Sequence, residues 1–104
     1  MEIIFQSHHA PISPFMRERA ERGVRKIAAR LTRVVDAVVR FEADGPLRRV
    51  LIMLHAPRHH DVRAEGSAPR VAGALSQALR RLDEQTRDPK RRPRTNPLKT
   101  ISLA

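Results

Sequence analysis

A chain of 104 residues with a formal net charge of +10 has room for one compact domain and is far more basic than a typical soluble enzyme. Most of the excess is arginine, which suits bidentate phosphate contacts, so the composition favours a nucleic acid as the partner over an anionic membrane surface. The chain has no cysteine and no apolar run near the ~20 residues of a membrane-spanning helix, so we expect a cytoplasmic protein without disulfides or thiolate metal sites.

The chain opens with an imperfect alternation over residues 2–7. Ile3 and Phe5 fall on one side, and Glu2, Ile4 and Gln6 fall on the other. A period of two residues is typical of a strand, so this segment is predicted to open a sheet.

A helix is predicted over residues 14–33. Ser13 is a suitable N-cap, and Pro14 fits the first helical position because it has no N–H to leave unpaired. The apolar residues recur every three or four positions and form one stripe that needs a core: Met16, Ala20, Val24, Ile27, Ala28 and Leu31. The other positions make a concentrated positive face: Arg17, Arg19, Arg22, Arg25, Lys26, Arg30 and Arg33, with only Glu18 and Glu21 of opposite charge.

Three further strands are predicted after this helix. Residues 35–43 alternate between an apolar and a mixed side, residues 47–56 are apolar enough for a central strand, and residues 60–66 alternate again. Asp44-Gly45-Pro46 has the composition of a tight turn, which makes the first two of these strands a hairpin. Gly45 and Gly66 are interpreted as single turn residues, so there is no glycine-rich phosphate loop.

The helical period returns over residues 69–87. Its apolar stripe consists of Val71, Leu75, Ala78, Leu79 and Leu82, and Arg80, Arg81 and Arg87 lie off it. The predicted order is therefore β-α-β-β-β-α, an α+β fold in which two helices pack on one face of a four-stranded sheet.

The end of the chain differs in composition. Residues 89–104 contain three prolines and a basic cluster, Lys90-Arg91-Arg92, with almost no periodicity. We therefore expect a domain over residues 1–88 and a basic, flexible tail over residues 89–104.

No set of residues predicts catalysis or a metal. The histidines His8, His9, His55, His59 and His60 are the only candidates for ligands, but adjacent histidines on a strand point to opposite faces, so their spacing argues against a shared ion. The serines lie in no nucleophile turn, and the paired carboxylates have the pattern of solvated helix faces. We expect no enzyme, no cofactor and no small-molecule substrate.

The basic pattern favours contacts with RNA phosphates. The chain has no tryptophan or tyrosine and only three phenylalanines, so it lacks an aromatic platform on which unpaired bases could stack. Phosphate contacts on structured RNA fit this composition better.

Several short sequence motifs occur in a fixed order over about residues 1–92, and they match the pattern of a known family. They are His8-His9 with Pro11-Ile12-Ser13, then Leu31-Thr32-Arg33, Val62-Arg63-Ala64-Glu65-Gly66, Ala74-Leu75 and Leu82-Asp83-Glu84-Gln85. In this order and spacing they resemble the ribosome hibernation-promoting factor and ribosome-associated inhibitor family, also called sigma-54 modulation proteins. By this resemblance we expect a short member of the family, without the additional C-terminal domain of long members.

The resemblance implies a fold related to double-stranded-RNA-binding domains. It also implies binding of a monomer to the small ribosomal subunit, in the channel used by mRNA and tRNA, with inhibition of translation in stressed or stationary bacteria. The residues that would contact 16S rRNA phosphates are Arg22, Arg25, Lys26, Arg30, Arg33, Arg80, Arg81, Arg87, Lys90, Arg91 and Arg92.

Two other functions remain open from the sequence. One is a protein-binding modulator of a transcription regulator, whose binding would depend much less on salt than that of an RNA binder. The other is a general structured-RNA-binding module, which would bind a plain duplex as tightly as a ribosome.

Overall fold

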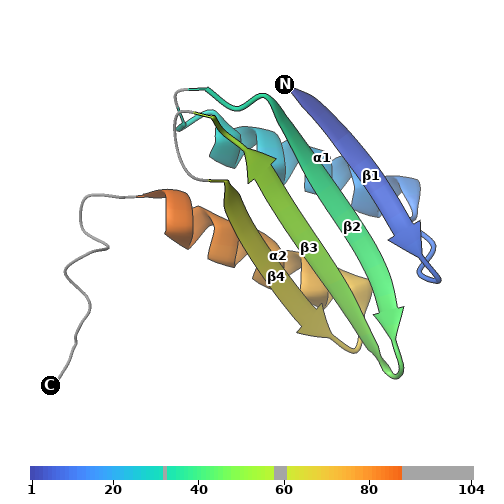
Figure 1. Ribbon diagram of the computed structural model, residues 1–104. Helices are drawn as coiled ribbons and strands as arrows, with labels where there is room; N and C mark the ends of the chain where they lie inside the picture. The colour runs from blue at the N-terminus through green and yellow to red at the C-terminus, as the bar shows by residue number, and fades with distance from the viewer. Residues whose placement is uncertain (32, 58–60, 88–104) are drawn as a thin grey trace, which may run out of the picture.

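The computed structural model describes residues 1–31, 33–57 and 61–87, and all structural statements below concern these residues. Three strands follow a first strand and helix, and a second helix ends the described chain (Figure 1). The elements are β1 (Glu2–His8), α1 (Pro14–Ala28), β2 (Asp36–Asp44), β3 (Leu47–His55), β4 (Val62–Ala68) and α2 (Val71–Arg87).

The molecule has two layers, a sheet and a pair of helices. The strands lie in the order β1-β2-β3-β4; β1 is parallel to β2, and the other neighbours are antiparallel. Both helices cover the same face of the sheet, with α1 behind β1 and β2 and α2 behind β3 and β4 (Figure 1). The predicted α+β fold and its β-α-β-β-β-α order are confirmed.

The core lies between the two layers, where the strand and helix periods predicted it. Alternate residues of the two central strands face the helices and are almost fully buried, and the stripes of both helices cover them. The core includes Ala37, Val39, Phe41, Val50, Ile52 and Leu54 from the sheet, Ala20, Val24 and Ile27 from α1, and Ala74, Leu75, Ala78 and Leu82 from α2.

The helix α1 begins as predicted but ends early. The Ser13 side chain accepts a hydrogen bond from the Met16 amide at 3.1 Å. The helix ends at Ala28 rather than at residue 33, because the amides of Arg30 and Leu31 bond to carbonyls three residues back and tighten the last turn. Leu31 still packs against the core from outside the helix, so its apolar periodicity was a correct guide to burial and a wrong guide to helix length.

Other boundaries shift by one or two residues. The helix α2 begins at Val71 rather than at residue 69, since the Arg70 carbonyl accepts the first helical hydrogen bond from the Ala74 amide. The strand β4 covers Val62–Ala68 rather than residues 60–66, and residue 60 lies outside the described residues. The β2 strand covers Asp36–Asp44, one residue later than predicted.

Gly66 is a buried strand residue, so its interpretation as a turn residue was wrong. A Cβ built on Gly66 would lie 2.1 Å from the Ala74 carbonyl oxygen and 2.6 Å from the Ala78 amide nitrogen of α2. Glycine is therefore required because the helix backbone lies directly on the strand. Gly45, by contrast, does occupy the predicted turn, with a φ of 61°.

We predict that Gly66→Ala destabilises the fold by about 3 kcal/mol, because the new methyl group must displace the α2 backbone. Gly45→Ala is the matched control, since nothing lies within 4 Å of the position that its methyl group would take. Its left-handed φ should cost only about 1 kcal/mol. Urea unfolding of both variants measures the difference, and equal losses of stability would contradict the close packing at Gly66.

Candidate nucleic-acid interface

The outer surface of the two helices carries a basic groove. Lys26 on α1, Arg30 just after it and Arg80 on α2 line a hollow of about 530 Å³, together with Gly23, Ile27, Leu79 and Asp83. A Cβ on Gly23 would lie 2.8 Å from Leu79 Cδ1, so the Leu79 side chain of α2 packs directly on Gly23 of α1 at the floor of this groove. Cations that are far apart in the sequence thus meet between the helices.

Three of the predicted phosphate-binding residues are exposed and available. The side chains of Arg22, Lys26 and Arg80 make no hydrogen bond or ion pair with any other residue that the structure describes. Their charges face solvent, where a polyanion would reduce the cost of holding like charges close together.

Two other predicted residues are exposed but engaged. Arg25 pairs with Glu21 at 3.1 Å and donates to the Met1 carbonyl at 3.3 Å, which fixes it at the β1 side of the helical layer. Arg30 pairs with Asp83 and so joins the end of α1 to α2. A guanidinium has five N–H donors, so each of these arginines keeps donors for a phosphate.

The remaining candidates lie beyond the groove or outside the described residues. Arg33 is exposed, but it lies in the connection to β2 and not on α1 as predicted. Arg87 is the last residue of α2. The predicted tail residues lie outside the described part of the chain: Lys90, Arg91 and Arg92.

Arg81 has a structural task that its position in the sequence did not reveal. Gln77, Arg81 and Gln85 are four residues apart, so they share one face of α2, and all three bond to the outer backbone edge of β4. Gln77 accepts from the Ser67 amide at 3.2 Å, Arg81 donates to the Glu65 carbonyl at 2.7 Å, and Gln85 donates to the Arg63 carbonyl at 2.7 Å. These side chains cover an edge that could otherwise pair with another strand.

Two further arginines of α1 also support the fold. Arg19 donates to Ser76 Oγ at 2.6 Å and to the Ala72 carbonyl at 3.4 Å, which ties α1 to the first half of α2. Arg17 lies 4.8 Å above the Phe5 ring, a favourable cation–π distance. The basic face of α1 therefore combines cations that hold the helical layer with cations that face solvent.

The opposite, open face of the sheet pairs two of its three arginines with its own carboxylates. Arg49 pairs with Asp44 at 2.8 Å and lies 3.7 Å from Glu42 and 3.9 Å from Glu65, while Arg40 lies 3.6 Å from Glu42. The positive surface of the described residues is thus concentrated on the helical layer.

Nothing in the described part of the chain forms a metal site or a membrane span. No group of three histidine, cysteine, aspartate or glutamate side chains is placed to hold an ion among the described residues, which exclude His59 and His60. Within those residues no helix is long and apolar enough to cross a bilayer.

We predict that Arg81→Ala lowers the free energy of unfolding by about 1 kcal/mol, because the Glu65 carbonyl loses a charged donor. Its neighbour Arg80→Ala should change stability by less than about 0.5 kcal/mol, since that side chain bonds to none of the described residues. Urea unfolding compares the two. A larger loss in the free energy of unfolding for Arg80→Ala than for Arg81→Ala would contradict the structural role of Arg81.

Two solved structures share this fold. A ribosomal subunit interface protein from Coxiella burnetii superposes with a TM-score of 0.72 at 16% sequence identity, covering 86% of this chain and 98% of that one. The N-terminal domain of Protein Y from Thermus thermophilus superposes with a TM-score of 0.69 at 23% identity, covering 83% of this chain and 96% of that one. At these identities the likeness concerns the fold alone.

The family comparison covers most of the chain. No protein with a curated description matches the sequence significantly. The model of the family described as sigma 54 modulation protein / S30EA ribosomal protein matches residues 3–94, which include every described helix and strand except the first residue of β1. The chain therefore belongs to this family of ribosome-associated proteins, which are not enzymes.

Proposed function

We propose that the protein binds the small ribosomal subunit through 16S rRNA phosphates in the channel used by mRNA and tRNA. By occupying that channel it inhibits translation during stress or stationary phase. The observation that carries the proposal is the concentration of exposed, unpaired cations on the helical layer, including Lys26 and Arg80 at the groove. Membership in a ribosome-associated family supports the ribosome as the source of the RNA.

The charge arrangement supports phosphate contacts over base recognition. The cations come from both helices and the connection after α1, so they can follow a sugar-phosphate backbone across the layer. No tryptophan or tyrosine is present for base stacking. Phosphate contacts carry no sequence information, so the shape of the rRNA surface would select the site.

The proposed contacts fall into three groups. Arg22, Lys26 and Arg80 are the unpaired cations, and Arg25 and Arg30 contribute donors left over from their ion pairs. Arg33, Arg87, Lys90, Arg91 and Arg92 are the remaining proposed contacts, whereas Arg81 contributes mainly by holding α2 on β4. The proposed protein is a cytoplasmic monomer that needs no cofactor.

The direct test is sedimentation of the purified protein with 30S, 50S and 70S particles at two salt concentrations. Binding through several phosphates predicts comigration with 30S and 70S but not 50S, and a steep loss of binding as salt rises. Comigration that does not change with salt concentration, or absence from all ribosomal fractions at low salt, would contradict the proposal. Equal affinity for a plain RNA duplex would instead favour a general RNA-binding module.

We predict that Lys26→Glu and Arg80→Glu each weaken 30S binding by roughly tenfold or more and reduce its salt dependence by about one released ion per lost contact. The matched control is Arg63→Glu, which makes the same charge change at an exposed position on the open face of the sheet. Affinities from salt-dependent cosedimentation, with thermal melts of all three variants, decide the outcome. Weakening by Arg63→Glu alone would place the RNA on the other face.

A further inference from the structure

The open face of the sheet carries an apolar strip that none of the described residues covers. Ile4 lies opposite Val38, and Val38 lies opposite Met53, so the three side chains form a row across β1, β2 and β3. They are on the face away from the helices, and Ile4 is 38% exposed. An apolar row of this kind is a candidate docking surface if a specific occupant can be identified.

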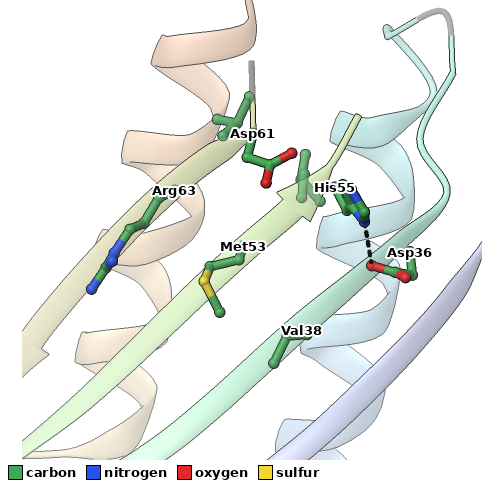
Figure 2. Close-up of a pocket in the computed structure, with 8 residues that line it drawn as sticks. Asp36, Val38, Met53, His55, Asp61 and Arg63 are labelled. Carbon is green, nitrogen blue, oxygen red and sulfur yellow. Dashed lines mark ion pairs between the residues drawn. The ribbon is translucent and has the colours of Figure 1, made fainter. Parts of the chain in front are cut away.

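The row ends in a hollow that extends over the end of β3 and the first residues of β2 and β4. This hollow has a volume of about 420 Å³, and its lining includes Val38, Met53, Asp61 and Arg63. Figure 2 shows Val38 and Met53 on adjacent strands, with the ion pair between His55 and Asp36 beside them.

The surroundings of the row are acidic. Glu2 lies directly opposite Asp36 on the neighbouring strand, a like-charge pair that is unfavourable without a cation. His55 Nδ1 is 3.8 Å from Asp36 Oδ1, and its ring carries a charge only when protonated. The six carboxylates on this face or its rim outnumber the three arginines: Glu2, Asp36, Glu42, Asp44, Asp61 and Glu65, against Arg40, Arg49 and Arg63.

The described chain ends beside this hollow. Gln85, in the last turn of α2, donates to the Arg63 carbonyl at 2.7 Å, and Arg63 lines the hollow. Residues 88–104 continue from that point. The twelve residues from Arg87 to Lys99 can reach up to about 40 Å when extended. The four strands of the sheet span only about 15 Å, so the tail is long enough to cross the open face.

The composition of this segment complements the face. It carries Lys90, Arg91, Arg92, Arg94 and Lys99 and only one carboxylate side chain, Asp88. Its last residues add apolar side chains, and an extended backbone would place Lys99, Ile101 and Leu103 on one side. A cation and two aliphatic side chains on one side match a face that offers carboxylates beside an apolar row.

We propose that the end of the chain, residues 98–104, docks in cis on the open face of the sheet, with Ile101 and Leu103 on the row of Ile4, Val38 and Met53 and Lys99 near Glu2 and Asp36. Lys90, Arg91 and Arg92 precede this segment in the sequence, so the docking does not use the proposed RNA contacts. This interaction does not depend on RNA and can be tested on the free protein.

The absence of cysteine in the chain allows one label to be placed without removing any other site. A nitroxide on Thr100→Cys of the full-length protein should broaden the amide signals of Val38, Met53 and Ile4 in two-dimensional NMR spectra. The signals of Lys26 and Arg80 on the helical layer should keep their intensity. The matched control carries the same label with Leu98→Ser, Ile101→Ser and Leu103→Ser, and it should lose the broadening.

Each other outcome would overturn the proposal. Absence of broadening, or broadening centred on the helical layer, would remove the open face as the docking site. Broadening that persists in the triple-serine control would show charge attraction without apolar docking. Broadening seen only when a labelled copy is mixed with an isotopically enriched, unlabelled copy would assign the contact to a second molecule.

Discussion

The close packing of α2 on β4 is the constraint on which the rest of the structure depends. Gly66 leaves no space for a side chain, so the backbones of the helix and the strand meet directly. This contact brings one face of α2 to the outer edge of β4, where Gln77, Arg81 and Gln85 bond to the strand backbone. The adjacent residue in the helix, Arg80, then faces the groove beside α1. Glycine in the strand thus determines which arginine supports the fold and which is available to a partner.

The two helices meet at a second glycine and at two side-chain contacts. Gly23 accommodates Leu79 at the floor of the groove, and the ion pair between Arg30 and Asp83 joins the helices at one end. Arg19 makes the corresponding connection to the first half of α2. Because the helices are fixed in this way, Lys26 and Arg80 are held on opposite sides of the groove before any partner binds. A preorganised set of cations avoids part of the entropy cost of binding.

The sequence predicted the fold well because two simple periods determine it. Burial follows the alternation in β2 and the three-to-four spacing in α1, and both hold in the structure even where boundaries moved. Apolar residues at helical spacing predict burial better than helix length, because Leu31 packs on the core after the helix has ended. The residue type alone also does not distinguish a glycine that is needed for close packing, such as Gly66, from a glycine that is needed for a turn, such as Gly45.

The site was harder to predict because charge alone does not reveal a partner. Arg80 and Arg81 are adjacent and equally basic, yet one faces the groove and the other bonds to the Glu65 carbonyl. The spacing of Gln77, Arg81 and Gln85 was present in the sequence, but its meaning depends on which strand edge lies beside α2. The clustering of Lys26 and Arg80 likewise depends on the distance between the helices, which no local pattern encodes.

The central claim is that the helical layer, and not the open face of the sheet, lies against 16S rRNA. The most direct measurement uses single cysteines introduced into this cysteine-free chain, each carrying a short photo-crosslinker. Arg22→Cys places the crosslinker on α1, and Ser67→Cys places it at an exposed position on the open face. In complexes with 30S subunits, we expect crosslinks to 16S rRNA from residue 22 and none from residue 67. Crosslinks to 16S rRNA from residue 67 alone would contradict it.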